Sequence, residues 1–140
     1  MADHHSDLDE FLTRRTRYAM LTTLRKDGSP TTVPIWYDWD GTVVSFFCGT
    51  TSIKLTRIAR DPRVTLLVSN DVDEPEYWVA FDGIAEVSEA SGLTLAEQLA
   101  PEYWDLDDPQ RAGALATWRA AGAEAFRLVT VEPAAIRTYA

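Results

Sequence analysis

The chain has 140 residues, a formal net charge of −9 and a sequence pI near 4.6. Such an acidic surface is repelled by phosphate backbones, so we expect no nucleic acid as a partner. No apolar run approaches the roughly 20 residues that span a bilayer, so we expect no membrane segment either. Cys48 is the single cysteine, which excludes an internal disulfide and favours a cytoplasmic protein with a buried, unreactive thiol.

The first elements in chain order are a helix within residues 1–16, with Ser6 as its N-cap, and two strands. The strands, Tyr18–Leu24 and Thr31–Tyr37, are joined by an Asp-Gly turn of the kind that is typical of hairpins. Pro34 lies inside the second strand, where it cannot donate a hydrogen bond to a neighbour. It therefore marks a sheet edge, a bulge, or backbone left open for another group.

Thr42–Phe47 predicts a third strand, and a turn with three hydroxyl residues at 50–52 follows it. A short helix starts there and ends at Asp61-Pro62, because the residue before a proline avoids the α region. The start of a helix has free N–H groups and a partial positive charge, which attract anions. Lys54 and Arg57 lie three residues apart on one side of this helix. The segment is either a phosphate site or an ordinary capped helix with solvated cations.

After this helix the chain returns to strands. Val64–Ser69 predicts one strand, and Tyr77–Val87 predicts a longer one with a bulge or bend at Asp82-Gly83. Residues 70–76 form an acidic loop between them. Clustered carboxylates can bind a cation, but this loop lacks the glycine and the spacing of a calcium loop. We therefore predict a solvated loop and no metal site.

The last third of the chain predicts a helical insertion, residues 88–123, before the final strand. One helix spans Ser88–Leu99, and a second begins at Pro109 behind an aspartate. From Phe126 the chain ends in strand. The whole pattern predicts a single domain, residues 1–140, that is mainly β with some helix (α+β): a six-stranded antiparallel barrel with peripheral helices.

The order of these motifs resembles the pyridoxamine 5'-phosphate oxidase-like family of flavoproteins, whose fold is the FMN-binding split β-barrel. The resemblance rests on the first hairpin, the second Asp-Gly turn at residues 38–41, and the stretch that begins Ser52-x-Lys54. It is clearest over residues 18–87, and Phe126–Arg137 also resembles the last strand of the family. The sequence of Leu24–Trp36 is more similar to the deazaflavin-dependent branch of the family, which uses coenzyme F420.

The resemblance implies an oxidoreductase that uses F420 to reduce a small electron-poor organic substrate by hydride transfer. It also implies a homodimer, because members of the family share the cofactor groove between two chains. The cofactor phosphate would lie at the hydroxyl-rich turn, and the ring would lie along the second strand, where backbone groups of Val33 and Ile35 would face it. The implied cofactor-binding residues are Thr32, Val33, Pro34, Ile35, Thr50, Thr51, Ser52, Lys54 and Arg57.

Two tryptophans, Trp36 and Trp78, are candidates for the walls of a substrate pocket. Packing in the core or at the dimer interface is the equal alternative, because aromatic side chains dominate these settings too. No catalytic residue is identifiable. Both histidines lie at positions 4 and 5, so no Ser-His-Asp or Cys-His set can form, and a proton would come from Tyr37, Tyr77 or water. This absence favours hydride transfer between bound molecules over hydrolysis.

One departure from the family pattern concerns the phosphate. The oxidase subfamily carries Ser-Arg-Lys where this chain has Ser52, Ile53 and Lys54, so one phosphate ligand is missing. Two alternatives therefore stay open. In the first, the protein is an FMN-binding flavin reductase or oxidase. In the second, it is a non-catalytic dimer that binds a flavin, a haem or another ligand.

Overall fold

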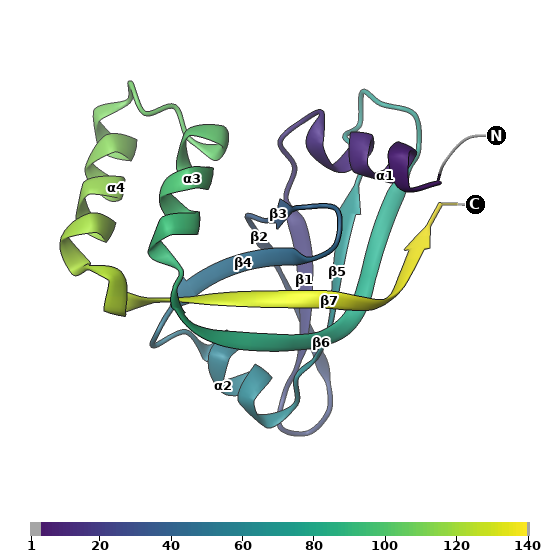
Figure 1. The fold of residues 1–140 in the computed structure, drawn as a ribbon, viewed down its shortest axis with the longest axis horizontal. Coiled ribbons are helices and arrows are strands. Elements are labelled where there is room, and N and C mark those ends of the chain that lie inside the picture. Colours follow the sequence, from purple (N-terminus) through teal and green to yellow (C-terminus); the bar gives the residue numbers. More distant parts are fainter. Residues whose placement is uncertain (1–3, 140) are drawn as a thin grey trace.

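The computed structural model describes residues 4–139, so the first three residues of the predicted N-terminal helix lie outside the described part. This part of the chain folds into one antiparallel sheet with four α-helices around it (Figure 1). In chain order the elements are α1 (His4–Thr13), β1 (Ala19–Leu24), β2 (Pro30–Ile35), β3 (Asp38–Trp39), β4 (Val44–Gly49), α2 (Ile53–Arg60), β5 (Arg63–Ser69), β6 (Trp78–Ser91), α3 (Leu93–Tyr103), α4 (Pro109–Ala121), a 3-10 turn (Ala123–Ala125) and β7 (Phe126–Thr138).

The sheet has seven strands in the order β2-β1-β5-β6-β7-β4-β3, so the prediction of six was wrong. The additional strand is β3, which the Asp-Gly pattern had placed in a turn. Trp39 is buried, and its indole N–H donates to the Asp9 carboxylate of α1 at 2.6 Å. This anchor holds the segment against β4, where Asp38 and Trp39 pair with Ser45 and Val44. The turn is correspondingly shorter.

The sheet curls without closing into a complete barrel. Its two terminal strands, β2 and β3, follow each other in the chain, so the ends of the sheet face each other across a gap. We call this gap between β2 and the β4–β3 end the seam. Figure 1 shows β4, β7 and part of β6 running across the view, nearly perpendicular to β1, β2 and β5. The predicted bulge in β6 is confirmed, because its register with β7 shifts at Asp82-Gly83.

The inward faces of the strands form the core, with two helices at its ends. α1 covers one end with Leu8, Phe11 and Leu12, and α2 covers the other with Ile58. α1 begins at His4, so Ser6 lies inside the helix and does not cap it as predicted. The buried face of α1, and not a cap, anchors this helix. The largest fully buried side chains in the sheet are Phe46, Phe81, Leu21 and Leu66.

The first helix of the insertion differs from its predicted bounds. β6 continues to Ser91, which pairs with Arg127 of β7, so α3 begins at Leu93 and not at Ser88. α3 also runs beyond Leu99 to Tyr103, even though it contains a proline. The strand pairing and the buried apolar face of α3 override the local sequence signals at both ends.

The other two helices have the predicted ends. Ser52 caps α2 by accepting a hydrogen bond from the Lys54 N–H at 3.2 Å, and α2 stops before Asp61. α4 begins at Pro109 and ends before Gly122, whose φ of 87° favours glycine. No helix in the described part of the chain is long and apolar enough to cross a membrane.

Gly92 joins β6 to α3 where two segments pass closely. A Cβ at this position would lie 2.5 Å from the main-chain oxygen of Arg127 and 2.8 Å from the Cβ of Phe47. We expect Gly92→Ala to lower the free energy of unfolding by about 1–3 kcal/mol, the usual cost of overpacking, in urea denaturation. Gly113→Ala is the control. Its added Cβ meets no atom within 4 Å, and it should raise stability by about 0.5–1 kcal/mol. Equal stability of wild type and Gly92→Ala would contradict the close approach.

The acidic loop is attached to the domain by an ion pair, which the prediction of a solvated loop missed. The Glu74 side chain is 8% exposed and binds both terminal nitrogens of Arg17, whose side chain is 1% exposed. Arg17 also donates to the Phe11 carbonyl, and its guanidinium lies 4.0 Å from the centre of that ring. Arg15 binds two aspartates of the same loop nearer the surface. Burial makes the pairing necessary, because an unpaired charge there would lose its hydration.

This ion pair makes a testable contribution to the pH dependence of stability. The hydrogen bonds from Arg17 hold the pKa of Glu74 well below its usual value of 4.5. The contribution of the charged carboxylate is therefore present at neutral pH, and it is lost as the pH falls below about 4.5 through the folded-state pKa. We expect Glu74→Gln to lower the free energy of unfolding at neutral pH, and its difference from wild type to shrink in acid.

Urea unfolding at several pH values checks this expectation. Glu76→Gln is the control, because Glu76 is an exposed residue of the same loop with no ion pair among the described residues. It should be as stable as wild type throughout the pH range. A destabilisation by Glu74→Gln that stayed constant with pH would contradict the electrostatic origin of the effect.

Candidate functional site

The hydroxyl-rich turn, residues 50–54, connects the end of β4 to α2. The N–H groups of Thr50, Ser52 and Lys54 donate hydrogen bonds within the protein. Those of Thr51 and Ile53 have no acceptor in residues 4–139. Two main-chain donors and the hydroxyl groups of Thr50 and Thr51 are thus available at the start of one helix, which the Ser52 hydroxyl caps. This is the donor set that an anionic group requires.

Lys54 and Arg57 add positive charge to this turn. Both are partly buried, and neither forms an ion pair within the described chain. Burial raises the pKa of the Cys48 thiol, and the positive charge of Lys54 partly opposes this rise. Cys48 is 7% exposed, as predicted for a buried thiol. The Lys54 side chain is partly buried in the first turn of α2.

β2 is an edge strand, one of the three possibilities that its proline left open. Just beyond the two strands, the Arg25 N–H donates to the main-chain carbonyl oxygen of Ser29 at 2.8 Å, so these two residues form a hydrogen-bonded pair in line with the β1–β2 ladder. Such pairs recur every second residue, so Val33 and Ile35 direct their main-chain groups to β1. This differs from our expectation that these groups face a cofactor ring.

The main-chain groups that do face the seam belong to the alternate residues of β2. Pro30 and Pro34 contribute a carbonyl each, and Thr32 contributes both a carbonyl and an N–H. A neighbouring strand needs several main-chain N–H donors to form a ladder, and this edge has only one, so another strand cannot pair with it. A flat heterocycle with donor and acceptor atoms can bind there instead. The side chains of Thr32 and Pro34 are exposed, whereas Val33 and Ile35 lie toward the core.

The chain carries the hydroxyl-rich turn across the open end of the seam. β4 lies on one side of the seam, and α2, which follows the turn, contacts β1 on the other side. Figure 1 shows α2 at the end of the domain where the β1–β2 hairpin turns. The individual hollows remain separate, because Thr50 lines one with Arg127 and Glu124, while Thr32 lines another with Trp78.

The second of these hollows is an open groove of about 460 Å³ on the outer face of the sheet. Met20 contributes to its apolar floor, and Thr32, Trp78 and Arg137 also line it. Asp82 fixes the orientation of Arg137 through hydrogen bonds of 2.6 and 2.9 Å. The groove therefore combines an apolar floor with an oriented guanidinium. Sequence reasoning found Trp78 but not this pair, whose members are 55 positions apart.

Trp36 belongs to an aromatic cluster between the sheet and the α3–α4 hairpin. Its ring is stacked on Tyr103, with centroids 4.8 Å apart and planes 6° apart. Trp104 and Phe47 meet Trp36 edge-on, and Trp118 lies 5.7 Å from it. The cluster occupies the seam directly beyond β2. The sequence did not predict that Tyr103, Trp104 and Trp118 belong to this cluster, because the aromatic residues of a helix do not by themselves show which strand the helix contacts.

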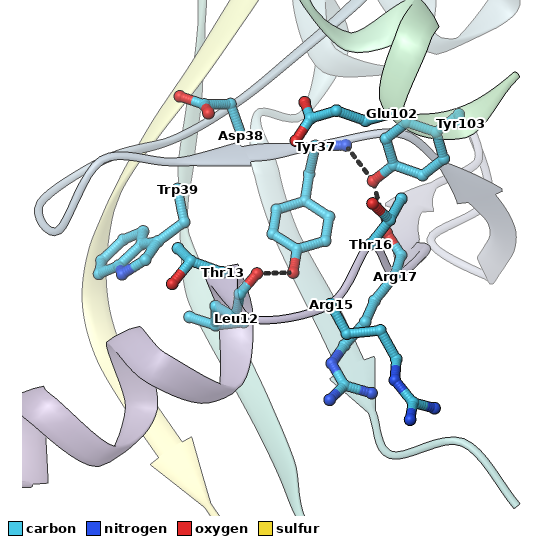
Figure 2. A pocket seen from close by; sticks show the side chains of 10 residues that line it. All are labelled: Leu12, Thr13, Arg15, Thr16, Arg17, Tyr37, Asp38, Trp39, Glu102 and Tyr103. Atoms are coloured by element: carbon cyan, nitrogen blue, oxygen red, sulfur yellow. Dashed lines mark hydrogen bonds between the residues drawn. The ribbon is translucent and has the colours of Figure 1, made fainter.

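A small polar cavity of about 90 Å³ lies beside this cluster, between α1, β3 and the end of α3 (Figure 2). Tyr37, one of the candidate proton donors, lines it but is only 6% exposed. Its hydroxyl donates to the Leu12 carbonyl at 2.8 Å, and burial raises its pKa above the usual value. Burial also raises the pKa of Tyr103 to about 12. Both phenols thus stay protonated at neutral pH and serve as hydrogen-bond donors.

These residues fit a ring that carries a phosphate. The turn at 50–54 has free donors, and Lys54 and Arg57 at the start of α2 form no ion pair among residues 4–139. The edge of β2 has free main-chain acceptors beside one donor. Ile53 stands where the oxidase subfamily has arginine, and its apolar side chain is 55% exposed. Lys54 and Arg57 are therefore the side chains that would balance the charge of a phosphate.

Comparisons with known proteins show which family and which solved structures the chain resembles. A family profile described as pyridoxamine 5'-phosphate oxidase matches residues 5–138. An F420 reductase of known structure is 26% identical, with a TM-score of 0.68 over 91% of this chain and 94% of that chain. A conserved hypothetical protein from Mycobacterium tuberculosis is 22% identical, with a TM-score of 0.70 over 99% and 85%. A haem-binding protein from Mycobacterium smegmatis is 18% identical, with a TM-score of 0.68 over 99% and 55%.

No match was found among curated proteins. The two structures below 25% identity show a common fold and nothing more. The family profile, in contrast, covers almost the whole chain. The chain therefore belongs to the pyridoxamine 5'-phosphate oxidase-like split-barrel family.

Proposed function

We propose that the protein is an F420-dependent oxidoreductase that transfers hydride to a small electron-poor organic substrate. Its family contains oxidoreductases and binds flavins, and the similar F420 reductase matches it over nearly its full length. The observation that carries the proposal is the seam. Unpaired cations and free N–H groups lie at one end of it, and the proline-containing edge of β2 lies along it.

Each part of the seam has a distinct role in this proposal. Lys54, Arg57 and the hydroxyls of residues 50–52 bind the phosphate of the cofactor through charge-assisted hydrogen bonds. Thr32 and the Pro34 carbonyl orient the ring. When bound, a reduced deazaflavin supplies the hydride. The apolar groove that contains Trp78 lies on the outer face of the same strands, and we assign the substrate to it.

Two alternatives make different demands on the same residues. FMN also has a tricyclic ring and a phosphate, so the same donors would serve a flavin reductase or oxidase. A non-catalytic dimer that binds a flavin or a haem is the second alternative. Ile53 favours it, because the exposed isoleucine weakens the phosphate site. The similarity to a haem-binding protein shows a common fold and does not decide between the alternatives.

Cofactor titrations distinguish these proposals. Purified protein is titrated with F420, FMN and haemin, and affinity is measured from cofactor fluorescence or absorbance. Reduced F420 is then supplied with a panel of enones, and its oxidation is followed by absorbance. We expect F420 to bind most tightly and its oxidation to depend on the enone. A yellow preparation that releases FMN would support the flavin enzyme, and tight binding without turnover would support the non-catalytic protein.

Lys54→Ala tests the phosphate site directly. We expect the variant to bind its cofactor about 1.5–3 kcal/mol more weakly, the scale of one charge-assisted hydrogen bond, when measured by calorimetry. Lys26→Ala is the control, because it removes the same charge from an exposed turn between β1 and β2. If Lys54→Ala and wild type bound the cofactor with equal affinity, the lysine would not be part of the phosphate site.

We also propose that the protein is a homodimer in the cytosol, where its buried cysteine stays reduced. The outer face of the sheet exposes 37% of Met20 in the groove and 52% of Ile84 in a neighbouring hollow. A second chain would cover the apolar surface around the groove and leave the groove itself to the substrate. Sedimentation equilibrium should give about twice the chain mass of 15.7 kDa. Met20→Glu should shift the protein toward monomer.

Val72→Glu is the matched control for this test, because Val72 is fully exposed in the acidic loop and away from the sheet. It should leave the dimer intact. A wild-type protein that binds its cofactor as a stable monomer would refute the homodimer.

A further inference from the structure

The β1–β2 ladder is interrupted one step after its last pair. Its hydrogen-bonded pairs recur every second residue from Arg25 and Ser29 onward, so the next pair would join Tyr37 to Arg17. The two residues do not bond to each other. The Tyr37 N–H donates to the Tyr103 hydroxyl at 3.3 Å, and this hydroxyl donates to the Arg17 carbonyl (Figure 2). A side chain from the end of α3 thus lies between the two strands.

The contacts of Tyr103 hold it in this place. Its ring is stacked on Trp36, the residue next to Tyr37, and Tyr18 of the neighbouring segment packs at 5.5 Å. A tyrosine is protonated at neutral pH, and burial raises the pKa of Tyr103 further, so the phenol donates its proton to the Arg17 carbonyl. The Tyr103 hydroxyl therefore accepts a hydrogen bond from the Tyr37 N–H and donates one to the Arg17 carbonyl.

We propose that Tyr103 is a positioning residue of the cofactor site, which holds the segment that follows β2 away from the segment that precedes β1 and so determines the course of the open edge from Thr32 to Trp36. This inference rests on the proposed function. Without the hydroxyl, the Tyr37 N–H either loses its acceptor or moves toward Arg17 by the width of one oxygen atom. In both cases Trp36 moves, and with it the edge along which the ring lies.

The experiment compares Tyr103→Phe with Tyr18→Phe. The first variant removes the two bridging hydrogen bonds and keeps the ring that stacks on Trp36. The second removes a hydroxyl from another tyrosine of the same cluster, which is 58% exposed and has no hydrogen bond among the described residues. Circular dichroism and thermal unfolding first establish that both variants fold.

Two readouts follow. By NMR, we expect the Tyr37 amide of Tyr103→Phe to change its hydrogen-exchange rate at least tenfold, with the Val33 amide as internal reference. In the presence of F420 or FMN, we expect about tenfold weaker binding and a changed absorption spectrum of the bound cofactor. Tyr18→Phe should resemble wild type in both measurements.

If the Tyr37 amide of Tyr103→Phe exchanged hydrogen at the wild-type rate, the hydroxyl would not hold the two segments apart, and the proposal would be overturned. If the exchange rate of this amide changed but the cofactor bound with wild-type affinity and a wild-type absorption spectrum, the positioning role would be overturned. If the wild-type protein binds neither F420 nor FMN, the proposed function fails, and with it the positioning role. The amide measurement, which needs no cofactor, would then still decide whether the hydroxyl separates the strands.

Discussion

Two prolines keep one edge of the sheet unpaired, and the rest of the structure depends on this edge. The main-chain groups of β2 that face away from β1 belong to Pro30, Thr32 and Pro34, so the edge has one N–H where a partner strand needs several. The sheet curls until its ends face each other, but it does not close. The seam that remains is bordered by main-chain groups with unused hydrogen-bonding capacity.

Charge is distributed unevenly around this seam. In the described part of the chain, Arg17 and Arg137 are paired with carboxylates and serve the structure, one below the acidic loop and one on the outer face of the sheet. Lys54 and Arg57 have no such partner and lie at the turn that crosses the end of the seam. In a chain with a net charge of −9, these two cations without a carboxylate partner create a local attraction for an anion.

The helical insertion contributes to the same region. α3 and α4 stand beside one end of the sheet in Figure 1, and their aromatic side chains pack on Trp36 and Phe47. Tyr103 reaches between β1 and β2, where it replaces a direct hydrogen bond of the ladder. The insertion is therefore part of the framework that places β2, and a change in its sequence can alter the seam without touching a residue that faces a ligand.

Local signals in the sequence determined much of this protein. The order of most strands and turns and the capped start of α2 follow from residues within a few positions of one another, and the order of these motifs identified the family. Pro34 left three possibilities open, of which the strand order decided for a sheet edge. Only the tertiary structure decided that β3 pairs with β4, that Thr32 and not Val33 faces the seam, and that Tyr103 bridges Tyr37 and Arg17. These features depend on ladder register and on side chains 66 and 86 positions apart, which meet only after the chain has folded.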